Sequence, residues 1–424
     1  MEQPDYLKIH RSRPCMPGYE RCALWMDRTK CTCALSPGLS WKSTAATDCF
    51  GLWSCDRIRD RRRTGDKKLF SIDVPAVVRP DQVLDLARLS SYLRSNIPSL
   101  NGELELLQFP SGHSNLTYLI KAGSRELVVK REPPGSKAKS AHDMGREFRV
   151  LSRLHGPYPY APAALHFCED DSIIGGKFCV MERVRGVIVR ADYPEDGGVT
   201  LEQIRAQFTG LIDALARLHS LNVSDVGLAD LGRPRGYRKR QVDGWLKRLS
   251  EAKTESMADF DEVTSWLAEQ IPADPEDAAI VHNDFKMDNL VWDPADITRL
   301  IAVLDWEMAT VGDPLMDLAC TLSFWAEQDD PADFRAIRGM PSARPGMLTR
   351  RQALARYTTL TKRTVERADF YLCFGFFRRA VIEQQKYFRY LRAETRDPRF
   401  SRLDEVVRVL RDMSISVLRG ETGI

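Results

Sequence analysis

The chain has 424 residues, of which 43% are hydrophobic and 29% charged, so it can form one large two-lobed domain or two ordinary domains. Its net charge of +3 provides no overall field for nucleic acid or a membrane surface, and no apolar run approaches the roughly 18 residues that cross a bilayer. The composition therefore predicts neither a nucleic-acid partner nor a membrane partner.

The first 75 residues differ from the rest in charge and cysteine content. They carry 14 Lys/Arg and 9 Asp/Glu, and six of the ten cysteines lie within the first 55 residues. We see no signal peptide and no C-x-x-C pair of the zinc-ribbon kind, so we expect a cytoplasmic, reduced protein. A cleaved organelle-targeting segment is the alternative, although the scattered acids argue against it. Lacking sustained periodicity, residues 1–74 are predicted to be a disordered extension.

The pattern changes at residue 75. Residues 82–93 have helical spacing, and β-rich stretches are expected at 103–109, 114–121, 126–131, 164–168 and 177–181, with one helix between the third and the fourth. After Thr200, which with Gln203 fits a capping box, the pattern is mostly helical, with short strands near 279–281, 290–292 and 300–304. We therefore predict an α+β fold with a small β-rich lobe at 75–184 and a large, mostly helical lobe at 185–424.

The most specific stretch is Val-His-Asn-Asp-Phe-Lys-Met-Asp-Asn-Leu-Val at 281–291. Asp284 and Asn289 have the D-x₄-N spacing of a kinase catalytic loop, and Asp305 follows 16 residues later, after apolar strand residues. In phosphoryl transfer, one carboxylate orients or deprotonates the acceptor hydroxyl, and an amide oxygen and a second carboxylate hold Mg²⁺ against the phosphates of ATP. Asp284 is therefore the predicted catalytic residue, and Asn289 and Asp305 are the predicted metal ligands. The alternative is a coincidental polar loop, which the preceding His282 and the flanking strands disfavour.

This loop resembles that of the aminoglycoside phosphotransferases, which has the pattern His-x-Asp-x₄-Asn, and the resemblance covers roughly residues 75–420. It implies a bilobal protein-kinase-like fold, ATP and Mg²⁺ as cofactors, and a buttressing role for His282. The stretch Gln-Phe-Pro-Ser-Gly-His-Ser-Asn-Leu-Thr-Tyr-Leu at 108–119 looks most like phosphotransferases found alone in bacteria and fungi or fused to acyl-CoA dehydrogenases in animals. That likeness implies a hydroxylated acyl substrate.

A kinase-like small lobe should supply a lysine for the α- and β-phosphates and an acid to hold it. Lys130 lies on the predicted third strand, and Glu147 lies on the following helix. Two other acids are rivals: Glu132 is too close in the chain to pair across the cleft, and Asp143 lies near the helix start, where an acid is expected anyway. We therefore predict the pair Lys130–Glu147.

The phosphate-covering loop is expected between the first two strands. It has only one glycine, so it is not G-x-G-x-x-G and could be an ordinary tight hairpin. In position it resembles the Ser/Asn-bearing loop of the phosphotransferases. The residues predicted to bind phosphate here are Ser111, Gly112, Ser114 and Asn115.

Three further predictions concern residues around the nucleotide. Met181 and Val184 fall where an interlobe hinge would present backbone groups to adenine, although an ordinary strand end would look the same. Lys286 is predicted to reach the γ-phosphate as a point charge, the alternative being a solvent-facing lysine. Asp313 and Asp317 resemble the family's Gly-Asp-Pro-x-x-Asp-Leu-Ala segment, and both are interpreted as structural.

The acceptor is predicted to be a small molecule bearing a hydroxyl group. Only residues 306–312 separate Asp305 from Asp313, which leaves no room for the activation segment on which a protein kinase docks a peptide. An inactive kinase-like nucleotide-binding scaffold is the alternative, but Lys130, Asp284, Asn289 and Asp305 are all present. A nucleic-acid-binding role for the extension is disfavoured by its nine acids.

Two basic stretches indicate the charge of that acceptor. Residues 235–248 contain six bases and one acid, and residues 371–400 contain seven bases and three acids. If these stretches wall the cleft, they suit an anionic or acyl-bearing alcohol better than a polycationic aminoglycoside. The alternative is that many of these bases lie on solvated helix faces.

Overall fold

The computed structural model describes residues 25–27, 30–32, 74–98, 100–109, 115–132, 143–190, 192–193, 198–274, 277–337, 339–395 and 397–423. The chain divides into two units, residues 1–66 and residues 67–424. In the first unit, β1 (Trp25–Asp27) and β2 (Lys30–Thr32) form a short antiparallel pair that the sequence analysis did not predict. The remaining residues up to 73, which were predicted to be disordered, lie outside the described residues.

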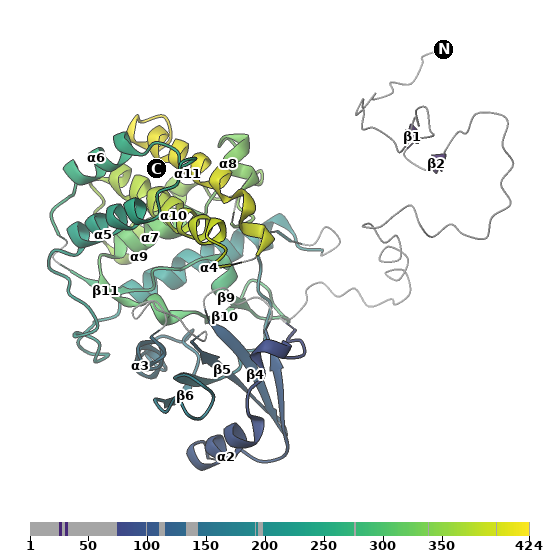
Figure 1. Ribbon diagram of the computed structural model, residues 1–424. Helices are drawn as coiled ribbons and strands as arrows, with labels where there is room; N and C mark the ends of the chain where they lie inside the picture. Colours follow the sequence, from purple (N-terminus) through teal and green to yellow (C-terminus); the bar gives the residue numbers. More distant parts are fainter. Residues whose placement is uncertain are drawn as a thin grey trace, which may run out of the picture. The chain divides into compact units, whose positions relative to one another are not determined.

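A five-stranded antiparallel sheet forms the small lobe of the second unit (Figure 1). Its strand order is β3 (Leu104–Gln108), β4 (Leu116–Ala122), β5 (Arg125–Arg131), β7 (Phe178–Glu182) and β6 (Ala164–Cys168). The short 3₁₀ turn η2 (Pro80–Gln82), α2 (Leu86–Asn96) and α3 (Met144–Leu154) complete the lobe. Asp143 caps α3 by accepting from the backbone N–H of Arg146, so the helix begins where a capping acid was expected.

The large lobe is mostly helical, as predicted. Its helices are α4 (Leu201–His219), α5 (Tyr237–Glu251), α6 (Asp261–Glu269), α7 (Pro314–Leu322), α8 (Ala332–Ala336), α9 (Arg350–Thr361), α10 (Ala368–Leu391) and α11 (Leu403–Leu418). The 3₁₀ turn η5 (Pro398–Arg402) precedes α11. Short strands form two antiparallel pairs, β9 (Leu290–Trp292) with β10 (Leu300–Val303) and β8 (Ala279–Val281) with β11 (Thr310–Gly312). Strand β11 was not predicted from the sequence.

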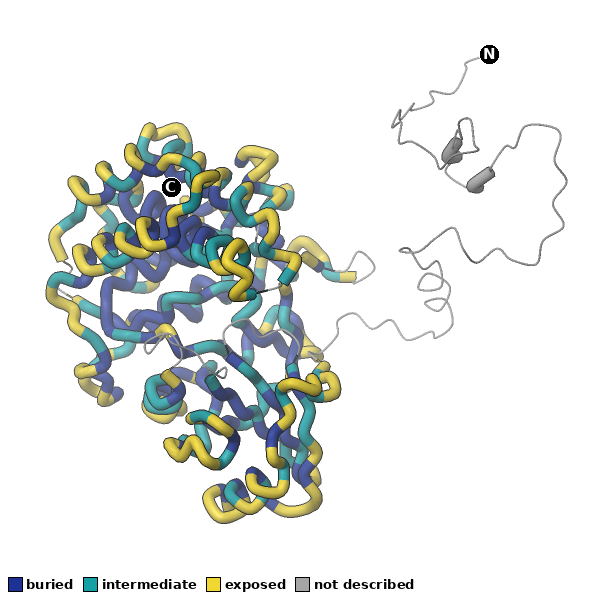
Figure 2. The backbone as a smooth tube through the Cα atoms, in the orientation of Figure 1, coloured by how far each residue is buried: buried dark blue, intermediate teal, exposed yellow. Residues whose placement is uncertain are grey.

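Helix α10 lies in the core of the large lobe. Residues 370–381 of this helix are all buried, and Figure 2 shows the dark blue interior of the helical lobe around it. Apart from Arg378 and Arg379, this span is apolar or small, as expected for a helix in the core of a large lobe. Among the described residues, no helix is long and apolar enough to pass through a membrane.

The segment that follows β7 passes tightly over the β9–β10 hairpin. Val187 and Trp292 exchange two backbone hydrogen bonds of 2.8 Å. A Cβ atom at Gly186 would lie 2.4 Å from Val291 Cγ1 and 2.5 Å from Trp292 O, so only glycine fits there. This contact ties the connection between the lobes to the hairpin that precedes Asp305.

Candidate active site

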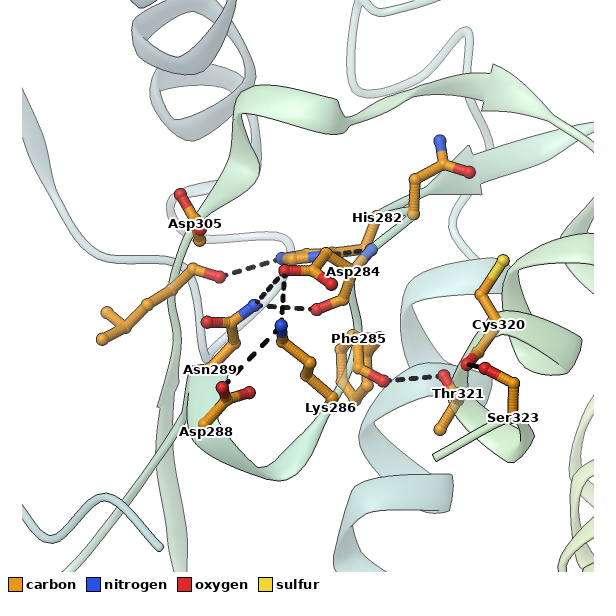
Figure 3. A network of polar contacts seen from close by, with 12 residues as sticks. His282, Asp284, Phe285, Lys286, Asp288, Asn289, Asp305, Cys320, Thr321 and Ser323 are labelled. Carbon is orange, nitrogen blue, oxygen red and sulfur yellow. Dashed lines mark hydrogen bonds and ion pairs between the residues drawn. The ribbon is translucent and has the colours of Figure 1, made fainter. Parts of the chain in front are cut away.

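The loop between β8 and β9 is held by its backbone. Asp317 on α7 accepts hydrogen bonds from the N–H groups of His282 (2.6 Å) and Asn283 (2.7 Å), and Asn283 has a left-handed backbone with φ of 66°. Arg378 on α10 donates to Asn283 O (2.7 Å), and Thr321 on α7 donates to Phe285 O (2.7 Å; Figure 3). Two helices of the core thus fix the backbone on both sides of Asp284.

Asp284 projects from this loop with 28% of its side chain exposed. Asn289, in the 3₁₀ turn η3 (Met287–Asn289), donates its amide N–H groups to Asp284 O (2.8 Å) and Asp284 Oδ2 (2.9 Å; Figure 3). Because the amide nitrogen is used in this way, the amide oxygen of Asn289 is the atom left to bind a cation.

His282 is buried, and both of its ring nitrogens contact backbone groups. Nδ1 accepts from the N–H of Asp284 (3.2 Å), so the other nitrogen, Nε2, donates to Leu304 O (2.9 Å). The ring therefore joins the loop to the residue before Asp305. This geometry agrees with the buttressing role that the family resemblance implied.

Lys130 joins the two lobes. Its Nζ lies 2.8 Å from Glu147 Oε1 on α3 and 2.8 Å from Asp305 Oδ1, which follows β10. Burial opposes the charged ammonium, but the charges of Asp305 and Glu147 hold the pKa of Lys130 well above its usual range. Burial likewise opposes the charge on Asp305, but Lys130 lowers the pKa of that carboxyl group.

Asn289 and Asp305 flank the β9–β10 hairpin, Asn289 directly before β9 and Asp305 two residues after β10. Leu304 donates its N–H to Asn289 O (2.8 Å), so the residue before Asp305 pairs with Asn289. Asp305 has a left-handed backbone with φ of 69°, at the start of the 3₁₀ turn η4 (Trp306–Met308). A carboxylate and an amide oxygen are the kinds of ligand that Mg²⁺ prefers.

Lys286 lies beside Asp284 rather than in open solvent. Its Nζ is 3.3 Å from Asp284 Oδ2 and 3.7 Å from Asp288 Oδ2, and 24% of its side chain is exposed (Figure 3). Burial acts against its charge, but Asp284 and Asp288 raise the pKa of Lys286 above its ordinary value.

The structure also brings in Glu307, to which no role was assigned from the sequence. Asn115, directly before β4, donates its side-chain N–H to Glu307 Oε2 across the lobes. Burial, followed by the charge of Asp305, raises the pKa of Glu307 to about 8. An acid two residues after a predicted metal ligand was the signal available in the sequence.

Of the predicted phosphate-binding loop, only Asn115 is described. Ser111, Gly112 and Ser114 lie outside the described residues. In the predicted hinge, Met181 is buried and pairs with Val128 of β5, and Val184 is half-buried beyond the end of β7.

The profile of APH, described as the phosphotransferase enzyme family, matches residues 105–352, which is more than half of the chain. The chain belongs to this phosphotransferase family. The matched range contains the predicted site residues Lys130, Asp284, Asn289 and Asp305.

Several curated relatives of this family member are acyl-CoA dehydrogenase family members. Member 11 of Rattus norvegicus is 34% identical over 326 residues, covering 74% of this chain and 41% of the relative. Member 10 of Mus musculus is 33% identical over 317 residues, covering 74% of this chain and 29% of the relative. The chain thus spans about two-fifths or less of the length of these relatives.

Solved structures support the same fold. A Ralstonia eutropha protein assigned to the aminoglycoside phosphotransferases superposes with a TM-score of 0.68 at 28% identity, covering 80% of this chain and 99% of that one. Macrolide 2′-phosphotransferase type I superposes with a TM-score of 0.50 at 17% identity, covering 78% and 98%, which shows a shared fold. The predicted family and the predicted bilobal kinase-like fold are therefore confirmed.

The two acids interpreted as structural, Asp313 and Asp317, have different contacts. Asp313 caps α7 by accepting from the N–H of Leu315 (2.9 Å), and it also pairs with Arg238. Asp317 holds the loop before Asp284, as described above, and also accepts from His219 Nε2 (3.1 Å). The contact of Asp317 with that loop was not predicted from the sequence.

The bases at 235–248 are less available to bind an acceptor than the composition suggested. Arg238 is buried against Asp313, whereas Lys239 and Lys247 are exposed and pair with acids one helical turn away. In the second stretch, Arg378 and Arg379 are buried, and neither forms an ion pair with a carboxylate in the described part of the chain. The predicted solvated-face alternative thus fits several of the bases but not these two.

Proposed function

We propose that this family member is a phosphotransferase that uses ATP and Mg²⁺ to phosphorylate a hydroxyl group of a small molecule. The observation that carries the proposal is the convergence of Lys130, Glu147 and Asp305 with the loop bearing Asp284 and Asn289. These residues come from both lobes and from segments up to 175 residues apart.

In the proposed reaction, Lys130 binds the α- and β-phosphates while Glu147 holds the lysine in place. Asp284 accepts the proton of the acceptor hydroxyl as the hydroxyl oxygen bonds to the γ-phosphorus. The bond from that phosphorus to the β–γ bridging oxygen breaks, and ADP leaves with the electron pair. Lys286 offsets negative charge on the transferring group.

The residues present fit a magnesium ion carried on nucleotide phosphates. Asn289 Oδ1 and the carboxylate of Asp305 would hold it, and when bound it would neutralise charge on the phosphates. Among the described residues, no group of three or more His, Cys, Asp or Glu side chains could enclose a metal. Two protein oxygens suit Mg²⁺ when phosphate oxygens and water supply its remaining ligands.

The acceptor in this proposal is an anionic alcohol, with hydroxyacyl compounds as the first candidates. Arg378 contacts the carbonyl of Asn283, next to Asp284, and Lys286 lies on the same loop. These cations favour an acceptor with a negative group over a polycation. The names of the acyl-CoA dehydrogenase relatives make an acyl compound the natural choice to test.

Calorimetric titration of the full chain with ATP and ADP, with and without MgCl₂, tests the nucleotide part of this proposal. We expect binding of both nucleotides, strengthened by Mg²⁺. Binding of neither nucleotide at millimolar concentration would contradict the proposed function.

A further inference from the structure

One aromatic ring beside the loop contacts two cations. Phe324 follows α7, and its ring centroid lies 5.4 Å from Lys286 Nζ and 4.5 Å from Arg379 Cζ. Both distances fall within the roughly 6 Å over which a cation is attracted to the face of a ring. The half-buried ring thus connects a cation of the loop with a cation of α10.

The carboxylates near Lys286 do not by themselves fix its ammonium group. The distances of 3.3 Å to Asp284 and 3.7 Å to Asp288 exceed the roughly 2.7–2.9 Å of a charge-assisted hydrogen bond. A lysine head on a flexible four-carbon stem keeps considerable freedom under such loose pairing. The ring of Phe324 is a third contact on the same ammonium.

The ring of Phe324 is itself held in place. Arg379 is 6% exposed, and its guanidinium donates to Ser323 O (2.8 Å) and Ile337 O (2.7 Å), so this cation has a fixed position. A Cβ atom at Gly339 would lie only 2.7 Å from Phe324 Cδ1, which shows how closely the backbone approaches the ring edge.

We propose that Phe324 is a positioning residue that holds the ammonium of Lys286 beside Asp284, ready for the γ-phosphate. This inference rests on the role given to Lys286 in the proposed function. A ring face attracts a cation without imposing a bond direction. Lys286 can therefore exchange its carboxylate partner for a phosphate oxygen while it stays against the ring.

A spectroscopic test of this contact does not depend on activity. Reductive ¹³C-methylation of lysines keeps their charge, and the Lys286 resonance is identified by its loss in Lys286→Ala. We expect ring-current shielding of this resonance in the wild-type chain and in Phe324→Tyr, and its loss in Phe324→Leu. The same Lys286 shift in the wild type and Phe324→Leu would overturn the inference even if the protein is an active phosphotransferase.

A kinetic test then asks whether the contact matters for phosphoryl transfer, with Mg·ATP hydrolysis in the absence of an acceptor as the reaction. Phe324→Leu should lower kcat roughly 3- to 30-fold with little change in ADP affinity, and Phe324→Tyr should recover most of the loss. In the Lys286→Ala background the same substitution should have almost no effect, because the cation it positions is gone. An equal loss in both backgrounds would assign Phe324 a structural role only.

The chain offers a matched control in Phe388, a half-exposed ring near the end of α10. Arg392 Cζ lies 5.3 Å from its centroid, so Phe388→Leu removes a comparable cation–ring contact away from the catalytic loop. This control should leave kcat at the wild-type level. A similar loss of kcat in Phe388→Leu would contradict a specific role for Phe324. Absence of nucleotide binding by the wild type would instead refute the proposed function, and the methylated-lysine spectra would still decide the contact.

Discussion

Lys130 Nζ and Asp305 Oδ1 lie 2.8 Å apart, although 175 residues separate them in the chain. The same ammonium lies 2.8 Å from Glu147 Oε1, whose side chain is 1% exposed. One lysine therefore joins the sheet and helix of the small lobe to the hairpin of the large lobe.

Replacing this lysine tests the link between stability and nucleotide binding. Lys130→Met leaves the carboxylate of Glu147 buried without its partner, so the free energy of unfolding should fall by about 3–5 kcal/mol and ADP binding should be lost. Lys121→Met on β4 is the control, because its ion pair with Glu105 is exposed and should contribute less than about 1 kcal/mol. Urea unfolding and ADP calorimetry measure both effects. Equal destabilisation by the two substitutions would show that the buried ion pairs of Lys130 have no special weight.

The proposed metal ligands can be tested through nucleotide binding. Asn289→Ala and Asp305→Ala should each raise the Mg²⁺ concentration needed for half-maximal ATP binding, because each removes an oxygen ligand. Asp288→Asn alters a neighbouring carboxylate that is not a proposed ligand, and it should leave the Mg²⁺ titration unchanged. If the titrations of the two alanine variants matched the wild type, the metal site would lie elsewhere.

Stability should depend on pH through the buried pair His219–Asp317. Burial lowers the pKa of His219, although its hydrogen bond to Asp317 acts in the opposite direction. Below the ordinary histidine pKa of about 6.5, the unfolded chain binds a proton that the folded chain excludes. The free energy of unfolding should therefore fall as the pH falls, by at most about 1.4 kcal/mol per pH unit for this one group.

His219→Gln should reduce that dependence. Urea unfolding at a series of pH values from about 7.5 down to about 5 measures the slope in the wild type and in the variant. The remaining histidines are the same in both proteins, so the difference between the slopes reports His219. Identical slopes would mean that His219 takes up its proton equally in the folded and unfolded chains.

Much of this site could be predicted from the sequence because its residues follow local patterns. The spacing of Asp284 and Asn289, the strand position of Lys130 and the helix position of Glu147 were each visible within short stretches. The contact of Asn115 with Glu307 and that of Phe324 with Lys286 were not, because each joins segments that only tertiary packing brings together.

Composition was a poorer guide to the acceptor side. From composition, the bases at 235–248 were expected to line the acceptor side of the cleft. Composition could not show that Arg238 is buried against Asp313 or that Lys239 pairs with Asp243. Nor could it show that Arg378 is buried without a carboxylate partner among the described residues and contacts the loop that bears Asp284. Charge counts become predictions about a cleft only when burial and pairing are known.

The proposed acceptor charge makes a prediction about salt. Anionic alcohols such as carboxylated, phosphorylated or CoA-linked hydroxy compounds should be used in preference to kanamycin-like amines, and the preference should weaken at high salt as charges are screened. Competition between the two classes at low and high ionic strength measures this effect. Efficient turnover of the amines with no use of the anionic alcohols would refute this choice of acceptor.

The proposed phosphotransferase activity is tested most directly by transfer of labelled γ-phosphate from ATP to a library of small hydroxyl compounds, measured with the full chain and with Asp284→Ala. We predict that the wild type labels at least one compound, and that Asp284→Ala lowers the rate by roughly 10²–10⁴-fold while ADP still binds. Transfer by Asp284→Ala at the wild-type rate would remove Asp284 from the mechanism. A wild-type chain that binds Mg·ATP but neither labels a compound nor hydrolyses ATP would contradict the proposed phosphotransferase activity and indicate an inactive nucleotide-binding scaffold.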